Sequence, residues 1–378
     1  MYWYVIVVGV LSFAYVFYML LYIKGWKNTP EFVPYKENGT SRVSVIIAAR
    51  NEERCIRDCL DDIVHQTYAP ELYEIIVVDD FSEDATCTVV ESFNLPNIRL
   101  LYLKDFLSEK YEKRSYKKKA IETAIQESSG DLIVTTDADC RMGKEWLATL
   151  VKYYEKKRCK MIIGPVLFVN GENIFEEFQA LDYLGMAAIA AGSLNFNFPT
   201  LCNGANLLYE KEAFKKVEGY TGNENIASGD DLLLMHKIWK QWPGEISYIK
   251  NRSSVVLTYP QHFLKDFFSQ RLRWASKSGN YSDWKIKLNL FLIYLFNVAF
   301  FINFFYSFFN SAVLPLFIVQ ASIKLVLDFV LLYSACTFFN RKKLLSVFLI
   351  SELFHLAYIT VTGLLGNIIR PVWKGRKI

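Results

Sequence analysis

Asp137 and Asp139 are the residues of this chain whose type and spacing point most directly to chemistry. They stand one residue apart, shortly after the apolar run Leu132-Ile133-Val134, so a strand that ends there would present both carboxylates at the edge of a sheet. Hard oxygen donors of this kind suit Mg²⁺ or Mn²⁺ carrying a diphosphate. The spacing therefore predicts a divalent-metal site, with a solvated acidic turn as the alternative.

Two further polar groups follow predicted strands in the first hundred residues. Residues 50–53 (Arg-Asn-Glu-Glu) come after the β-rich run 43–49, and residues 79–82 (Asp-Asp-Phe-Ser) come after the run 74–78. Carboxylates there can accept hydrogen bonds from a ribose hydroxyl or a uracil imide. We predict nucleotide contacts in both groups. The alternatives are helix-start acids in the first group and turn or cap residues in the second.

A cation-rich stretch runs from Lys104 to Lys119 and ends in three consecutive lysines at the start of a predicted helix. Its first part, up to Lys113, is typical of a solvated loop. A lysine at a helix start near Asp137 can offset the charge of a diphosphate. We favour Lys119 over Lys118 for this role.

Two adjacent aspartates, Asp230 and Asp231, precede a helix-like apolar run. Acids at that position are commonly helix caps. Alternatively, Asp231 can act as a general base within hydrogen-bond reach of a hydroxyl, and the sequence supports both interpretations equally. Asn203 and Gly204, just before a short apolar strand, are predicted to contact the molecule that carries this hydroxyl.

Gln270, Arg273 and Trp274 have i, i+3 and i+4 spacing, so one face of a helix carries all three. An arginine there can clamp a phosphate while the tryptophan stacks on a sugar or closes a lid. The surrounding stretch, 262–284, mixes aromatic and basic residues, which is typical of a helix lying in a membrane interface. The two interpretations are compatible.

These motifs need a sheet that brings strand ends together. Alternating strand-like and helix-like segments indicate an α/β fold with a doubly wound, mainly parallel sheet, in which ligands sit beyond the carboxyl ends of the strands. The predicted strands are 43–49, 74–78, 98–103, 132–136, 161–168 and 207–209, and the predicted helices are 53–66, 117–127 and 144–157.

Long apolar segments flank this soluble block. The 378 residues are 52% hydrophobic with a formal net charge of +4, which indicates neither nucleic-acid binding nor disorder. Residues 2–23 and 288–319 carry no charge. We predict four membrane segments, with a re-entrant or interfacial helix pair as the alternative for the last one, 344–369. The charged or ionisable residues inside the later segments are Lys324, Asp328, Glu352 and His355.

Basic residues predict the orientation of these segments. Lys24 and Lys27 follow the first segment, and residues 341–343 (Arg-Lys-Lys) join the third and fourth, so the positive-inside rule places the soluble block in the cytosol. Seven cysteines without metal-site spacing fit reduced thiols there. We expect an integral protein of a bacterial inner membrane or another membrane that faces the cytosol. The predicted divisions are an anchor at 1–24, a cytosolic domain at 41–260, an interfacial helix region at 261–287, membrane segments at 288–369 and a basic tail at 370–378.

In their order and spacing, these motifs resemble those of the membrane-bound glycosyltransferases of family 2, which have the GT-A fold. The resemblance runs from about Val43 to Trp274. It implies that Asp137 and Asp139 bind the metal and UDP, that Asp230 and Asp231 supply the catalytic base, and that Trp274 also contacts the acceptor. The donor-binding residues that it implies are Ala49, Asn51, Glu52, Asp80, Lys119, Asp137, Gln270, Arg273 and Trp274.

The chain departs from the family pattern at Lys118-Lys119-Ala120, where Gly-Lys-Ala is common, and at Asp230, where Glu is commoner. Its short membrane part looks closer to ceramide-glucosyltransferase-like or lipid-glycosylating members. The resemblance implies inverting, metal-dependent transfer of a sugar from a UDP-linked donor to a membrane-held lipid or glycolipid. The alternatives are a processive polysaccharide synthase with a partner subunit, a nucleotidyltransferase, and a nucleotide-sugar-binding protein without catalysis.

Overall fold

The computed structural model describes residues 2–107, 115–224, 226, 229–276, 283–366 and 368, together with the backbone of 372–373 and 376–377. The chain divides into two compact units. The helical unit consists of residues 1–29, 168–200 and 260–371, and the sheet unit consists of residues 30–167, 201–259 and 372–378. Residues 168–200, inside the domain expected at 41–260, thus belong to the helical unit.

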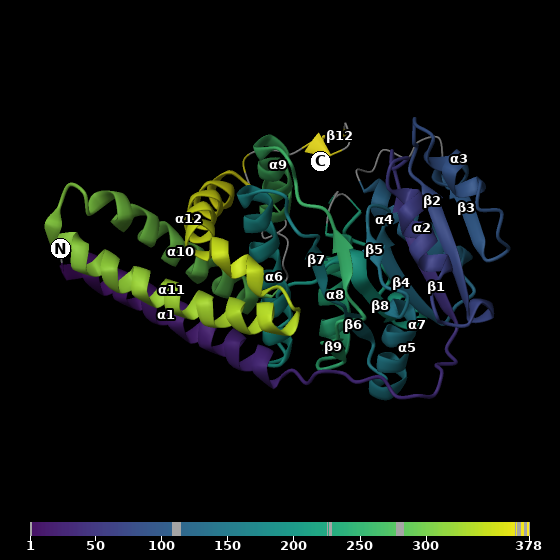
Figure 1. Ribbon diagram of the computed structural model, residues 1–378, viewed down its shortest axis with the longest axis horizontal. Coiled ribbons are helices and arrows are strands. Elements are labelled where there is room, and N and C mark those ends of the chain that lie inside the picture. The colour runs from purple at the N-terminus through teal and green to yellow at the C-terminus, as the bar shows by residue number, and fades with distance from the viewer. Residues whose placement is uncertain are drawn as a thin grey trace. The chain divides into compact units, whose positions relative to one another are not determined.

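A seven-stranded sheet forms the centre of the sheet unit, in the order β3-β2-β1-β4-β8-β6-β9 (Figure 1). Every pairing in it is parallel except those of β8 with its two neighbours, which confirms the predicted α/β fold with a mainly parallel sheet. The strands are β1 (Val43–Ala49), β2 (Tyr73–Asp79), β3 (Ile98–Tyr102), β4 (Leu132–Asp137), β6 (Met161–Ile163), β8 (Leu207–Glu210) and β9 (Ile246–Tyr248).

Smaller elements complete the sheet unit. A three-stranded sheet has the order β5 (Arg141–Met142), β10 (Val256–Thr258) and β7 (Val166–Phe168), and β11 (Val372–Trp373) pairs with β12 (Arg376–Lys377). The helices are α2 (Ile56–Val64), α3 (Thr86–Glu91), α4 (Tyr116–Glu127), α5 (Trp146–Lys157), α7 (Lys211–Lys216) and α8 (Asp230–Gln241), with 3₁₀ turns at Pro70–Leu72, Leu103–Phe106 and Gly204–Asn206.

The register of the central strands aligns their carboxyl ends. Ala49 of β1 pairs with Asp79 of β2, and Ala48 pairs with Asp137 of β4. All three strands are nearly continuous apolar runs and almost fully buried, as expected for parallel strands covered on both faces. Because they run in one direction, the polar residues that follow them gather at one edge of the sheet, which we call the carboxyl edge.

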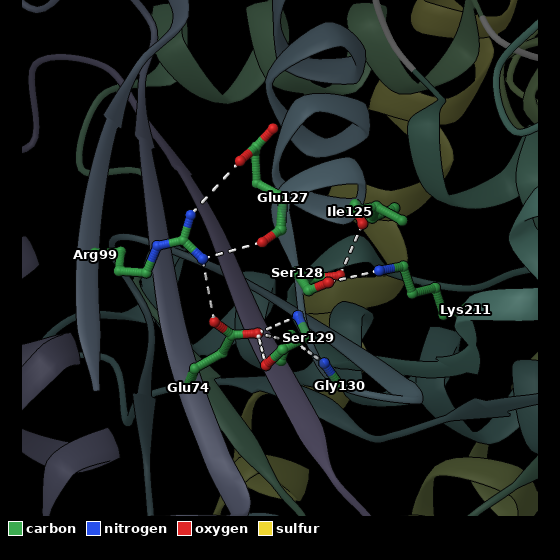
Figure 2. Close-up of polar contacts among 9 residues, drawn as sticks. Glu74, Arg99, Ile125, Glu127, Ser128, Ser129, Gly130 and Lys211 are labelled. Atoms are coloured by element: carbon green, nitrogen blue, oxygen red, sulfur yellow. Dashed lines mark hydrogen bonds and ion pairs between the residues drawn. The ribbon is translucent and has the colours of Figure 1, made fainter. Parts of the chain in front are cut away.

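At the opposite edge, polar contacts tie together the segments where the strands begin (Figure 2). Glu74 accepts hydrogen bonds from Ser44 Oγ at 2.7 Å and from Ser129 N at 2.6 Å. Arg99 lies 3.5 Å from Glu74 and donates to the Glu127 carbonyl at 3.0 Å. Partial burial by itself would raise the pKa of Glu74, but the bonds from Ser129 and Ser44 lower this pKa overall. These contacts hold the strands in register.

The apolar run 161–168, predicted as one strand, forms two. Pro165 has no N–H for a strand ladder, and a β-carbon at Gly164 would come 2.3 Å from Asn206 Nδ2. Asn206 is fully buried, and its amide donates to the carbonyls of Pro165 at 2.9 Å and Ser254 at 2.8 Å. The chain therefore breaks here, so that β6 stays in the large sheet while β7 joins the small one.

In the described part of the chain, four helices are long and apolar enough to cross a membrane, as predicted. They are α1 (Tyr2–Asn28), α10 (Trp284–Tyr306), α11 (Leu314–Phe338) and α12 (Phe348–Leu365), and the helical unit also contains α6 (Ile174–Leu194) and α9 (Leu264–Ala275). Helices α1, α10 and α11 lie side by side (Figure 1). Short 3₁₀ turns at Ser311–Val313 and Lys342–Val347 precede α11 and α12.

Three charged residues of α11 and α12 pair with one another. Lys324 Nζ lies 2.5 Å from Asp328 Oδ2 and 2.9 Å from Glu352 Oε2, and Tyr15 of α1 donates to Asp328. An isolated charge in a membrane-spanning helix is costly. Pairing with Lys324 therefore offsets part of the cost of placing two carboxylates in α11 and α12.

Candidate active site

The loops that follow β1 and β2 are joined by hydrogen bonds at the carboxyl edge. Asn51 has a positive φ of 50°, its Oδ1 accepts from Glu83 N at 2.9 Å, and its N donates to Ser82 Oγ at 3.0 Å. Glu52 N donates to Thr86 Oγ1 at 2.7 Å. Residues 50–53 are therefore held by the loop after β2 and lie outside α2, which begins at Ile56.

The same loop pair fixes Asp80. Its N donates to the Ala49 carbonyl at 2.8 Å, and its own carbonyl accepts from Arg50 Nη1 at 2.8 Å. Asp80 is 2% exposed. Asp79 accepts a hydrogen bond from Ser82 N at 3.1 Å, so it stabilises the turn after β2. This is the alternative role that the sequence allowed for it. The predicted nucleotide contacts thus lie at the end of β1 and on the loops after β1 and β2, and they are Ala49, Asn51, Glu52 and Asp80.

Asp137 is the last residue of β4, and Asp139 lies in the turn that follows. Directly after this turn, Arg141 forms a two-point ion pair with Asp62 of α2, with Nε 2.6 Å from Oδ2 and Nη2 2.9 Å from Oδ1. Pairs of this geometry give orientation as well as strength. Sequence reasoning missed this pair because its partners are far apart in the chain. It holds the turn that carries Asp137 and Asp139.

One ammonium group connects two acidic patches of the sheet unit. Lys117 Nζ lies 2.7 Å from Asp137 Oδ1 and 3.6 Å from Asp230 Oδ2. Burial by itself would lower the pKa of Lys117, but Asp137 and Asp230 raise it overall, so the ammonium stays charged. The sequence favoured Lys119 over Lys118 for offsetting the diphosphate charge near Asp137. The structure places Lys117 there, and Lys119 pairs with Glu122 of its own helix at 2.9 Å.

Asp231 lies beside the turn that contains Gly204. Its Oδ2 accepts from Gly204 N at 3.2 Å, while its Oδ1 accepts from the next N–H of α8 at 2.7 Å, so one oxygen serves the helix start. A β-carbon at Gly204 would come 3.2 Å from Asp230 Oδ2, which shows how closely the turn approaches both acids. Asn203 accepts from Ala205 N at 2.9 Å. The structure thus brings Asn203, Gly204, Asp230 and Asp231 together.

Lys118 holds the loop that leads into α8. It is buried, and its Nζ donates to the carbonyls of Asn223 at 3.0 Å and Ile226 at 2.7 Å. Ser115 Oγ donates to the Glu224 carbonyl. The start of α4 therefore positions Lys117 and this loop together.

Gln270, Arg273 and Trp274 lie on α9 of the helical unit. The helix covers all three positions, as their spacing predicts. The ring of Trp274 contacts that of Tyr183, with centroids 5.7 Å apart. The chemical roles of these residues, and of those at the carboxyl edge, stay predictions.

Asp137 and Asp139 fit a hard divalent cation. Mg²⁺ is commonly held by one or two carboxylates together with substrate phosphates. Among the described residues, no group of three or more His, Cys, Asp or Glu side chains could form a cage made of protein alone. A cation at this turn would therefore take its remaining ligands from water or from substrate phosphates.

Comparison with known proteins identifies the class. The family model described as Glycosyl transferase family 2 matches residues 44–217. A second model, Glycosyl transferase family group 2, matches residues 132–351, which is more than half of the chain. The chain therefore belongs to the family 2 glycosyltransferases, as its motifs suggest.

Curated relatives are similar to part of this chain. Glycosyltransferase AglE of Haloferax volcanii is 31% identical over 190 residues, which cover 50% of this chain and 58% of that protein. A Methanococcus voltae protein named dolichyl N-acetyl-α-D-glucosaminyl phosphate 3-β-D-2,3-diacetamido-2,3-dideoxy-β-D-glucuronosyltransferase is 24% identical over 249 residues, 63% of this chain and 73% of that protein. The matches span 58%, 50% and 57% of the lengths of relatives from Haloferax volcanii, Sulfolobus acidocaldarius and Bacillus subtilis.

A solved structure has a similar fold. Mannosyltransferase PcManGT of Pyrobaculum calidifontis, in complex with GDP-Man and Mn²⁺, aligns with a TM-score of 0.57 over 93% of this chain and 99% of that chain. The two sequences are 19% identical in this alignment, so the likeness concerns the fold alone. It confirms the GT-A architecture.

Proposed function

We propose that this protein transfers a sugar from a nucleotide-sugar donor to a lipid or glycolipid acceptor held in a membrane, with inversion at the anomeric carbon. The observation that carries the proposal is the position of Lys117, whose ammonium lies 2.7 Å from Asp137 and 3.6 Å from Asp230. The acids suited to a donor diphosphate and the acids suited to an acceptor hydroxyl are therefore neighbours at the carboxyl edge. Membership of the glycosyltransferase family supports the same reaction.

On the donor side, we assign UDP to the loop pair after β1 and β2. Mg²⁺ or Mn²⁺ would be held by Asp137 and Asp139, and it would neutralise the charge of the diphosphate. We assign Lys117, in place of Lys119, to the same diphosphate, because Lys117 lies 2.7 Å from Asp137 whereas Lys119 pairs with Glu122 of its own helix. The remaining proposed donor contacts come from the motif on α9 and are Gln270, Arg273 and Trp274, the last of which also serves the acceptor.

On the acceptor side, Asp231 is the proposed general base. The acceptor oxygen forms a bond to the anomeric carbon while the bond from that carbon to the diphosphate breaks, and the hydroxyl proton passes to the Asp231 carboxylate. A single displacement of this kind inverts the anomeric carbon and needs only one base. Asp230 supports the reaction by orienting Lys117, while Asn203 and Gly204 are the proposed acceptor contacts.

The helical unit supports the proposal of a membrane-held acceptor. Four helices suit a membrane by length and composition, and the Methanococcus voltae relative is named for a dolichyl-linked substrate. Lys24 and Lys27 directly follow the apolar part of α1, so the positive-inside rule favours a cytosolic sheet unit, at a bacterial inner membrane or a comparable one. We therefore place the protein among the lipid-glycosylating, ceramide-glucosyltransferase-like members of its family.

The test is a product analysis with purified full-length protein in nanodiscs. Membrane lipids, Mn²⁺ and a panel of UDP- and GDP-sugars are supplied, and products are identified by mass spectrometry. One sugar added to a lipid, together with free nucleoside diphosphate, is the expected result, with activity lost in Asp231→Asn and kept in the exposed control Asp131→Asn. A long polymer would indicate a processive synthase, and release of pyrophosphate a nucleotidyltransferase. Absence of turnover with every donor would overturn the proposal.

A further inference from the structure

Arg271, inside the motif on α9 but not assigned by it, is one of the most buried charged residues of the helical unit. It is 2% exposed, and its Nη2 lies 2.9 Å from Asp182 Oδ2 on α6. None of its three guanidinium nitrogens makes a hydrogen bond within the described residues, so the contact with Asp182 is an ion pair. Burying an arginine is costly unless its surroundings compensate for the loss of water. The groups that surround Arg271 therefore indicate its structural role.

Aromatic rings supply most of these surroundings. The guanidinium carbon lies 4.4 Å from the ring centre of Trp274, 5.0 Å from that of Phe267 and 5.4 Å from that of Tyr358. A flat guanidinium stacks on aromatic faces and is attracted by their electrons. The closest of the three rings belongs to Trp274, which is three residues further along α9. Arg271 and Trp274 therefore form an i, i+3 pair.

Two neighbouring helices hold this pair. Tyr358 of α12 donates its hydroxyl to Asp182, 3.0 Å from each carboxylate oxygen, so it orients the carboxylate that binds Arg271. The next residue of α6, Tyr183, contacts Trp274 with ring centroids 5.7 Å apart. Consecutive residues of α6 thus engage Arg271 and Trp274 separately, which restricts rotation and sliding of α9.

We propose that Asp182, Arg271 and Tyr358 form a buried bracket that fixes the indole of Trp274, and that Arg271 and Asp182 are positioning residues for sugar transfer. The inference rests on the proposed function, in which Trp274 contacts donor and acceptor. An apolar side chain could fill the same space without the cost of burying a charge. The arginine instead supplies a planar group whose direction is set from α6 and α12.

A double-mutant cycle tests this dependence in the full-length protein. Arg271→Lys keeps the positive charge but removes the plane that stacks on the indole, so transfer should fall about tenfold or more. In a Trp274→Ala background the same change should cost less than about twofold, because the group that it positions is absent. Equal losses in both backgrounds would show that Arg271 acts independently of Trp274 and would overturn the proposal.

Fluorine NMR of protein labelled with 5-fluorotryptophan provides a readout that does not need activity. The Trp274 resonance is assigned by its loss in Trp274→Phe. It should shift in Arg271→Lys and Tyr358→Phe but stay in place in the control Tyr294→Phe, which removes a hydroxyl that contacts the carbonyl of Thr360 on α12 at 3.3 Å. If the Trp274 resonance does not move in Arg271→Lys, the proposed bracket is refuted, even if the protein transfers sugar. If no donor supports transfer, the proposed function fails while this measurement still decides on the bracket.

Discussion

Replacing Lys117 by methionine tests the electrostatics at the centre of the candidate site. The change nearly preserves side-chain length but removes the ammonium that lies 2.7 Å from Asp137 and 3.6 Å from Asp230. The Lys117 side chain is 25% exposed, so its charge acts in a medium between water and the protein interior. Unit charges about 4 Å apart interact there by roughly 1 to 4 kcal/mol, and about 1.4 kcal/mol corresponds to a tenfold change.

Two measurements should move in opposite directions in Lys117→Met. Without nucleotide, the variant should bind Mn²⁺ about tenfold more tightly than the wild type, because no ammonium competes for Asp137. With donor and acceptor present, its kcat should fall about 100-fold or more, because the departing diphosphate loses a fixed positive charge. Paramagnetic resonance of free Mn²⁺ gives the first quantity, and mass spectrometry of the glycosylated lipid gives the second.

Lys119→Met is the matched control. Lys119 forms an ion pair with Glu122 of its own helix at 2.9 Å, and partly exposed pairs of this kind contribute little to stability. The Mn²⁺ affinity and the kcat should therefore both change by less than about threefold. The reasoning is refuted if Lys117→Met stays within that range in both measurements, or if Lys119→Met has the larger effect. The second result would return the diphosphate role to Lys119.

Three further changes probe the base, the metal and the sheet. Asp231→Asn should bind nucleotide normally but transfer about 10²- to 10⁴-fold more slowly, and near-normal turnover would exclude it as the base. Asp139→Ala should abolish the Mn²⁺ dependence of UDP binding; an unchanged Mn²⁺-dependent affinity would contradict the metal assignment. Glu74→Gln should destabilise the strand starts by about 1 to 3 kcal/mol at pH 7, seen as faster amide hydrogen exchange in β1 and β2, with the exposed Glu71→Gln as control. Because folding lowers the pKa of Glu74, its contribution is present above the ordinary carboxyl pKa and is lost as the pH falls through the folded value. Exchange in Glu74→Gln should therefore approach that of the wild type in acid, and a difference that grows on acidification would contradict this account.

The sequence by itself determined the layout of the carboxyl edge. Apolar runs without alternation suit parallel strands that are covered on both faces, and the direction of the chain then places the residues after each strand at one edge. This is why residues 49–53, 79–82 and 137–139 could be assigned to a common edge, as the pairing of Ala48 with Asp137 shows. Length and apolar composition likewise sufficed to predict the four apolar helices.

Short elements and local breaks were harder to predict. Strands β9 and β10 have three residues each. Three residues are too few to show the periodic pattern by which a strand is recognised in a sequence. The break between β6 and β7 depends on Asn206, which approaches Gly164 from a distant part of the chain. Within residues 161–168, only the Gly164-Pro165 pair indicates it.

Only the tertiary structure decided which polar side chains meet. Successive residues of a helix point about 100° apart, so which of the three lysines at the start of α4 faces Asp137 depends on how that helix packs. Arg271 belongs to the stretch of mixed aromatic and basic residues that was predicted to lie in a membrane interface, yet Asp182 and Tyr358 from two other helices bury it. The physical reason is that backbone hydrogen bonding and the burial of an apolar run follow from neighbours in the chain. An ion pair between segments forms only after packing has brought them together.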